Sequence, residues 1–351
     1  MTIFSGVLLD RYGARKTLSI ATAMVASGIL LFGSATTWLM IIFGQILMGL
    51  GGAFGYPGKG YLIRHWFAVG SFGLMFGLSQ TLVTFSSAVA QGGIGYMLLR
   101  FSWREIMFYG AGFGLVLTLA MALFIRDPDE VLQKPSQSST GFWQGIYNAI
   151  KEVVSDRQIW VWALLGSMVF GTIMSINVLW GVKLLIARDF DATTAGTVNA
   201  SMWFGYALGG PMVALICNRF KSFKVPLGFG IAGLLLTTLV LLKLPDLSLY
   251  SAYALYVSLG LFGATAIISF IVTTKICRDV VAGTALGIVN AIMFFAVGIL
   301  LWLPARIIGN VELTSNSIER GMLFLPVALG VALFSLLFVK DIFNSSSHQY
   351  A

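Results

Sequence analysis

The chain has 351 residues, of which 58% are hydrophobic and 10% are charged, against about 45–50% apolar and about 25% charged residues in an ordinary soluble domain. A water-soluble globule could not bury so much apolar surface, so the composition excludes one and indicates a protein whose solvent is the lipid bilayer. The net charge of +8 does not indicate a nucleic-acid partner, because the basic residues lie in short clusters between apolar runs and form no continuous basic face.

The apolar residues form ten runs of roughly 20 residues, long enough for helices that cross the hydrocarbon core. The runs lie near residues 17–35, 38–62, 71–98, 105–125, 159–182, 194–217, 226–244, 250–274, 281–303 and 321–339. Residues 1–9 have the character of the last turns of another helix, which starts too late to span. The sequence therefore predicts an all-α integral membrane protein with about ten complete transmembrane helices plus an N-terminal stub.

The loops between these runs differ in their basic residues. Loops on one side hold 15 Lys and Arg, and loops on the other side hold 7. The positive-inside rule places the richer set in the cytoplasm. We therefore expect a multi-pass protein of a cell membrane, of the bacterial inner-membrane kind, with its C-terminus in the cytoplasm.

The longest polar stretch divides the chain. Residues 127–158 are rich in Ser, Gln and charge, which predicts a cytoplasmic linker whose later part, from Phe142 to Val154, forms an interfacial helix. The predicted organisation is an incomplete helical bundle at 1–126, the linker at 127–158, a six-helix bundle at 159–343 and a polar tail at 344–351.

An internal repeat supports this division. The segment that begins at Gly6 is matched by one that begins at Ala214, 208 residues further along, and the Gly73/Gly77 pair is matched by Gly283/Gly287, 210 residues further along. About 50 residues that precede the motif in the second half have no counterpart in the first half. We expect either a misassigned start, a truncated gene or a shortened variant.

Several motifs resemble those of the major facilitator superfamily. The most specific is Gly6-x-x-x-Asp10-Arg11-x-Gly13-x-Arg15-Lys16, which is similar to the loop between the second and third helices of that family. Others are Gln45-x-x-x-Gly49-x-Gly51-x-Ala53, His65-Trp66-Phe67 and Trp103-Arg104. The resemblance implies a fold of two helical bundles that open alternately to the two sides of the membrane.

The sequence also departs from the family pattern. The family often has Arg where Gln45 stands and Asp where Asn218 stands, so one charge network is neutralised in each half. The segment from Ser87 to Gly93 lacks the Gly-Pro pair typical of the family's drug exporters. This absence favours uptake over export.

The resemblance implies two sets of functional residues. The loop motif is a conformational gate in the family, and its positions here are Gly6, Asp10, Arg11, Gly13, Arg15 and Lys16. The alternative is that these charges only fix the topology. The candidates for solute binding, from helices that line the family's central cavity or flank it, are Gln45, Lys59, Gln80, Asn177, Trp180, Trp203, Tyr206, Tyr256 and Asn290, with Asn199 beside them. The alternative is that the amides join helices, the aromatics pack, and Lys59 extends to the interface.

Other chemistry has little support in the sequence. The 14 Asp and Glu lie in loops or at helix ends, so no carboxylate inside a span suggests a proton relay, and coupling to H⁺, coupling to Na⁺ and simple facilitation all stay open. No phosphate-binding glycine loop and no His or Cys cluster is present, so no cofactor and no metal are expected.

These observations favour secondary active transport of a small polar organic solute, of the amino acid or organic acid type, by a monomeric uptake symporter. The alternative is a non-transporting membrane sensor of the same fold, or an inactive truncated remnant. A membrane enzyme is the weakest hypothesis, because no nucleophile and base occur together within the spans.

Overall fold

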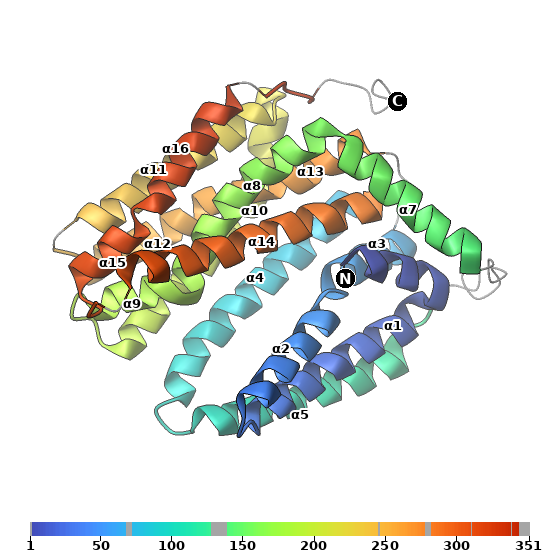
Figure 1. Ribbon diagram of the computed structural model, residues 1–351, viewed down its shortest axis with the longest axis horizontal. Helices are drawn as coiled ribbons and strands as arrows, with labels where there is room; N and C mark the ends of the chain where they lie inside the picture. Colours follow the sequence, from blue (N-terminus) through green and yellow to red (C-terminus); the bar gives the residue numbers. More distant parts are fainter. Residues whose placement is uncertain are drawn as a thin grey trace. The chain divides into compact units, whose positions relative to one another are not determined.

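The computed structural model describes residues 2–67, 72–127, 139–244, 246–277, 282–309, 311–337 and 339–343. Regular structure in these residues is entirely helical (Figure 1), which confirms the predicted all-α class. The helices are α1 (Thr2–Gly33), α2 (Trp38–Gly52), α3 (Gly55–Trp66), α4 (Phe72–Met97), α5 (Trp103–Phe124), α7 (Ser139–Ser155), α8 (Arg157–Ser175), α9 (Gly181–Ile186), α10 (Ala192–Phe220), α11 (Lys224–Lys243), α12 (Leu249–Gly263), α13 (Ile267–Ile276), α14 (Ala282–Ile308), α15 (Ser315–Met322) and α16 (Phe324–Leu336). A π-helical segment, η2 (Ile176–Trp180), joins α8 to α9, and a 3₁₀ turn, η3 (Ala264–Ala266), joins α12 to α13.

Nine stretches of the described residues are helical, long enough and apolar enough to cross a membrane. They confirm nine of the expected spans. The remaining one, near 71–98, falls on α4, which has 26 residues and whose first side chains lie partly outside the described part of the chain. α7 occupies the segment where an interfacial helix was expected.

The chain forms two compact units. The first unit comprises Met1–Ser79, Tyr96–Val153 and Gly283–Ile288, and the second comprises Gln80–Gly95, Val154–Ala282 and Val289–Ala351. In the first unit α1 packs along α2 and α5 (Figure 1). A Cβ on Gly28 would lie 2.7 Å from the carbonyl oxygen of Gly44, so the absence of side chains lets these two helices touch.

The second unit is built around a similar contact between α10 and α12. A Cβ on Gly205 would overlap the carbonyl group of Val257, and one on Gly209 would lie 2.7 Å from the carbonyl oxygen of Leu261. Two glycines four residues apart thus let α10 and α12 approach closely. The surroundings of Gly73, Gly77 and Gly283, which belong to the repeat, lie outside the described residues.

A break in one helix of each predicted half supports the internal repeat. In one half Ala53 follows α2, and its N–H donates to the carbonyls of Gly49 and Gly51. In the other half Ala264 follows α12, and its N–H donates to the carbonyls of Gly260 and Phe262. The two alanines are 211 residues apart and have nearly the same backbone angles, φ −61° and ψ −18° against φ −59° and ψ −20°. The domain boundaries themselves stay a prediction.

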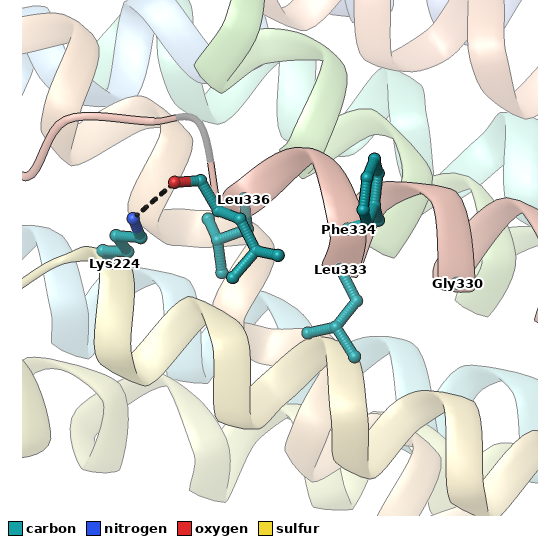
Figure 2. Close-up of a pocket in the computed structure, with 6 residues that line it drawn as sticks. Lys224, Gly330, Leu333, Phe334 and Leu336 are labelled. Carbon is teal, nitrogen blue, oxygen red and sulfur yellow. Dashed lines mark hydrogen bonds between the residues drawn. The ribbon is translucent and has the colours of Figure 1, made fainter.

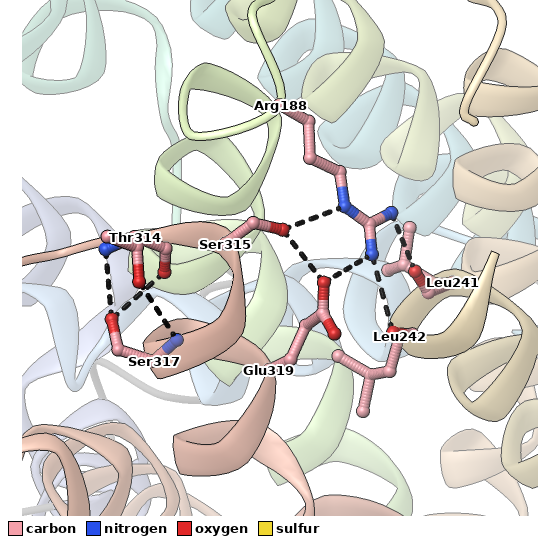
Figure 3. A network of polar contacts seen from close by, with 7 residues as sticks. All are labelled: Arg188, Leu241, Leu242, Thr314, Ser315, Ser317 and Glu319. Atoms are coloured by element: carbon pink, nitrogen blue, oxygen red, sulfur yellow. Dashed lines mark hydrogen bonds and ion pairs between the residues drawn. The ribbon is translucent and has the colours of Figure 1, made fainter. Parts of the chain in front are cut away.

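Arg188 joins three helix ends in the second unit (Figure 3). Its guanidinium donates to the carbonyls of Leu241 and Leu242 in the last turn of α11, at 2.9 and 3.4 Å. It also donates to Ser315 Oγ at 3.3 Å and forms an ion pair with Glu319 at 2.9 Å. The Arg188 side chain is only 7% exposed, and its charge is met by a carboxylate and by the negative end of a helix dipole.

Candidate solute-binding and gating sites

A π-helical turn interrupts the first long span of the second unit. The span runs for 30 residues, Arg157–Ile186, and the turn occupies Ile176–Trp180. Such turns widen the backbone by one residue and occur frequently at functional sites. Asn177 lies in this turn and is 3% exposed, so its amide must find its partners inside the protein.

Three amides meet at the turn. Asn177 and Gln91 of α4 exchange hydrogen bonds, with Gln91 Nε2 donating to Asn177 Oδ1 at 3.3 Å and Asn177 Nδ2 donating to Gln91 Oε1 at 3.4 Å. Asn177 Nδ2 also donates to the Asn199 carbonyl at 3.2 Å, and Asn199 Nδ2 donates to the Asn177 carbonyl at 2.7 Å. We call Gln91, Asn177 and Asn199 the amide cluster.

One acceptor of the amide cluster is left without a donor. In the described part of the chain, Asn199 Oδ1 is buried and receives no hydrogen bond. It faces Gly181, where a Cβ would lie 2.9 Å from it. A buried polar atom without a partner is uncommon in proteins and calls for an explanation, of which a role in binding is one.

Two predicted site residues hold the turn in place through their polar atoms. Trp180 Nε1 donates to the Leu301 carbonyl of α14 at 3.0 Å. The Tyr256 hydroxyl donates to the Gly181 carbonyl at 2.9 Å. Both side chains are almost fully buried, so in this structure their polar groups serve the protein itself. These bonds tie the turn to α14 through Trp180 and tie the residue after the turn to α12 through Tyr256.

The other solute-binding candidates lie apart from the amide cluster. In the second unit, Trp203 and Tyr206 of α10 form an edge-to-face pair with ring centroids 5.9 Å apart. Gln80 on α4 and Asn290 on α14 are half-buried. In the first unit, Gln45 on α2 is exposed, and Lys59 on α3 is half-buried with its ammonium 4.4 Å from the Tyr56 ring centroid.

The sequence missed Gln91 as a site residue. The signal was present, because Gln91 is an amide within an otherwise apolar run, and such a group must be paired. The surrounding segment, Ser87 to Gly93, entered the prediction only through its lack of a Gly-Pro pair.

The candidate gate is built around Gly13, which bends α1 with φ 79° and ψ 167°. Beyond this bend a new helix begins, and the carboxylate of Asp127 lies at its N-terminus. Asp127 Oδ1 accepts from the N–H of Ala14 at 2.5 Å, and both of its oxygens accept from the N–H of Arg15 at 3.3 Å. Arg15 Nε donates in turn to the Ala122 carbonyl near the end of α5, at 2.6 Å.

This geometry requires glycine at position 13. Its backbone conformation is one that is essentially confined to glycine, and a Cβ there would overlap the carboxylate of Asp127. Lys16 is exposed. The side chains of Gly6, Asp10 and Arg11 lie outside the described residues, so their gating role stays a prediction. Asp127 was expected only as the start of the linker.

Two features define the class of this protein. Nine described stretches are able to cross a membrane, and the irregular, polar turn lies inside one of them. This is a polytopic membrane protein in which interrupted helices carry polar groups at membrane depth, an arrangement found in secondary transporters.

The comparison with known families gives the membership directly. The sequence model described as Major Facilitator Superfamily matches residues 1–302, and the chain belongs to this superfamily, whose members are transporters and not enzymes. The resemblance inferred from the loop motifs is confirmed.

Curated relatives are distant. The probable sulfoacetate transporter SauU of Cupriavidus necator is 21% identical over 67% of this chain and 59% of its own. The probable galactarate/D-glucarate transporter GudP of Bacillus subtilis is 22% identical over 66% and 57%. The multidrug resistance protein MdtH of Photorhabdus laumondii is 25% identical over 59% and 47%. The chain thus spans about half to three fifths of the length of these relatives.

Solved structures agree on the fold. A bacterial homologue of the human lysosomal transporter Spinster, inward-facing and occupied, superposes with a TM-score of 0.70 at 14% identity, covering 96% of this chain and 84% of that one. A mutant of the nucleoside transporter NupG gives 0.68 at 14% identity, covering 96% and 86%. At this level of identity the likeness concerns the fold alone.

Proposed function

We propose that the protein takes up a small organic solute that carries a carboxylate, of the organic acid or amino acid type, across the cell membrane by alternating access. The observation that carries the proposal is the amide cluster on the π-helical turn, with its unpaired acceptor. Support comes from two relatives whose names specify organic acids, sulfoacetate and galactarate or D-glucarate.

Each amide of the cluster brings both donors and acceptors, which suits a solute that has hydroxyl or amino groups beside a carboxylate. The Asn177–Gln91 bonds are long, at 3.3 and 3.4 Å, so exchanging them for bonds to a solute costs little. Trp180 and Tyr256 keep the turn in place while this exchange occurs.

In the first unit, Lys59 is the charged member of the candidate set. We propose that it attracts anionic solutes to the first unit, since an ammonium held away from bulk water interacts strongly with an anion. The Tyr56 ring, whose centroid lies 4.4 Å from the ammonium, attracts the cation and partly offsets its lost hydration.

Transport would be measured with the full chain in proteoliposomes, with sulfoacetate, glucarate and a set of amino acids tested under imposed H⁺ and Na⁺ gradients. We expect one organic-acid or amino-acid class to accumulate inside, and the gradient that drives accumulation to identify the coupling ion. Binding of a solute to the protein without its accumulation inside the proteoliposomes would support the non-transporting alternative.

The amide cluster is tested by Asn177→Ala. Loss of a hydrogen bond to a charged solute should raise its half-saturation concentration about tenfold. Thr238→Val is the matched control, because Thr238 is buried in the same unit and its hydroxyl bonds only within its helix, to the Leu234 carbonyl at 2.7 Å. An unchanged half-saturation concentration for Asn177→Ala would return the amide cluster to a packing role.

A further inference from the structure

An apolar groove lies between α11 and α16 of the second unit, away from the amide cluster. It has a volume of about 380 Å³ and is lined by Lys224, Gly330, Leu333, Phe334, Leu336 and Leu337. Figure 2 shows Lys224 at one end of the groove and Gly330 at the other, with the leucines between them. Phe334 and Leu337 are 62% and 67% exposed, so the groove opens onto the outer surface of the helices.

The position of the groove in the membrane follows from its helices. α11 has 20 residues and begins at Lys224, so it spans about 30 Å, the thickness of the hydrocarbon core, and Lys224 lies at headgroup level. From Leu337 to Gly330 the groove follows α16 for about 10 Å toward the membrane interior, which is about two thirds of one leaflet's hydrocarbon thickness.

The polar end of the groove is positively charged. Lys224 is the basic residue that lines it, and Asp341 is the carboxylate that accepts from the Lys224 backbone N–H at 3.4 Å. The oxygens of Asp341 are directed at the backbone N–H groups of Phe223, Lys224 and Phe343 and at Ser222 Oγ. The Asp341 carboxylate is therefore occupied by these donors, and the Lys224 ammonium is the charge that lines the groove.

Lys224 retains a donor for a ligand. Its ammonium donates to the carbonyls of Leu337 and Val339 at 3.2 and 3.0 Å. An ammonium has three N–H groups, so these two bonds fix its position and leave one donor without an acceptor among the described residues. A cation at headgroup level at the end of an apolar groove can bind an ionised phosphate, and the groove can hold a long hydrocarbon chain joined to that phosphate.

We propose that this groove binds an anionic phospholipid, with the phosphate on Lys224 and one acyl chain lying along Leu336 and Leu333 toward Gly330. Basic pockets between transmembrane helices on the cytoplasmic side suit such headgroups, and this is the side on which the basic loops place Lys224. The occupant is a lipid and not free phosphate, because the groove offers its chain an apolar surface that phosphate does not use.

The test measures lipid retained by the purified full chain with native mass spectrometry, after titration with phosphatidylglycerol or with phosphatidylcholine of the same acyl chains. We expect phosphatidylglycerol to bind more tightly, and Lys224→Gln to weaken its binding about fivefold, since one basic residue contributes about that factor at an anionic surface. Lys224→Arg should retain binding. Lys340→Gln is the control, because Lys340 is exposed and is not among the residues that line the groove.

A second variant leaves the charges untouched. Gly330→Phe places a ring in the acyl end of the groove, where a Cβ meets no atom within 4 Å, so the fold has room for it. Gly298→Phe is its control, because Gly298 on α14 is exposed and has equally open surroundings. We expect Gly330→Phe to reduce binding of phosphatidylglycerol at least fivefold and Gly298→Phe to leave it unchanged.

Four results would overturn the proposal. The first is equal retention of the two lipids. The second is unchanged binding of phosphatidylglycerol in both Lys224→Gln and Gly330→Phe. The third is inorganic phosphate raising the melting temperature as much as phosphatidylglycerol does, which would make the site an anion site without a lipid. A dimer that Gly330→Phe abolishes would likewise assign the groove to a second copy of the chain. None of these readouts depends on transport.

Discussion

The start of the span after Gly13 and the start of α11 are built in the same way, 209 residues apart. At each, an aspartate from the end of that half accepts hydrogen bonds from the first backbone N–H groups of the helix, Asp127 in one and Asp341 in the other. At each, a basic side chain from the same turn donates back to carbonyls near the end of the half's last helix. We call these the first and second caps.

The two caps differ in how completely they are formed. Asp127 accepts from two backbone N–H groups, and a glycine-only conformation at Gly13 is needed to bring it close. Asp341 accepts from the backbone N–H groups of Phe223 and Lys224 and also from Ser222 Oγ, and its bond from Phe343 is local to its own turn. Because the additional Ser222 bond must be broken on opening, we expect the first cap to open and close more readily and the second to hold its helices together. The following substitutions separate these two roles.

The largest effect is expected at Arg188, which joins helix ends in the second unit. Arg188→Ala leaves Glu319 and two carbonyls without their cation, and removing one partner of a largely buried pair costs about 3–5 kcal/mol. We expect a clear fall in melting temperature in detergent, with the half-saturation concentration of the remaining folded protein unchanged. A melting temperature equal to that of the wild type would mean that the second unit does not depend on this ion pair.

The next effect is at Gly13. Gly13→Ala forces a side chain into a conformation that costs about 1–3 kcal/mol and displaces Asp127, which costs about 1 kcal/mol more through the lost cap. We expect turnover in proteoliposomes to change by at least tenfold, because a bias of about 1.4 kcal/mol between two open states changes their ratio tenfold. Lys221→Gly at the second cap, where φ is 46°, is the control, since it relieves strain there and should leave turnover unchanged.

The two aspartates provide the direct comparison. Asp127→Asn and Asp341→Asn each remove a charge at a helix N-terminus, worth about 0.3–1 kcal/mol. If the caps have different roles, Asp127→Asn changes turnover more than Asp341→Asn does. Asp341→Asn in turn lowers the melting temperature more than Asp127→Asn does. The same ratio of the two effects in both variants would show that the caps are equivalent.

Much of the fold could be predicted from the sequence, because span length and loop charge depend on local composition alone. The helix breaks at Ala53 and Ala264 and the tight contact at Gly205 agree with the repeat and the glycine spacing. The caps could not be predicted. Asp127 lies 112 residues from Arg15, and its position looked like the beginning of a polar linker. Only the packing of α1 against α5 brings the two together.

The candidate site was predicted in part for the same reason. Asn177 was identified as an amide on a helix that lines the cavity in the resembled family, but its partner Gln91 is 86 residues away. The π-helical turn has no sequence signature that would distinguish Ile176–Trp180 from an ordinary helical turn. Trp180 and Tyr256 were predicted as solute contacts, whereas their polar atoms are bonded to backbone carbonyls here. Whether they also touch solute stays a prediction.

The smallest effect is expected from replacing Arg15 of the first cap by lysine, the residue that the second cap has at the corresponding position. Arg15 uses its Nε for one carbonyl, that of Ala122 at 2.6 Å, whereas Lys224 uses its ammonium for two, those of Leu337 and Val339. A lysine therefore performs at the second cap what arginine performs at the first, and both cations lie at the negative end of a helix dipole. Arg15→Lys should keep that attraction. We expect its effects on turnover and on melting temperature to correspond to free-energy changes of less than about 0.5 kcal/mol.

Arg15→Met keeps the apolar stem and removes the charge and the bond, which should cost about 1 kcal/mol and change turnover about fivefold. Equal losses in the lysine and methionine variants would show that the first cap depends on the shape of the guanidinium, and the parallel between the two caps would then be limited to their carboxylates.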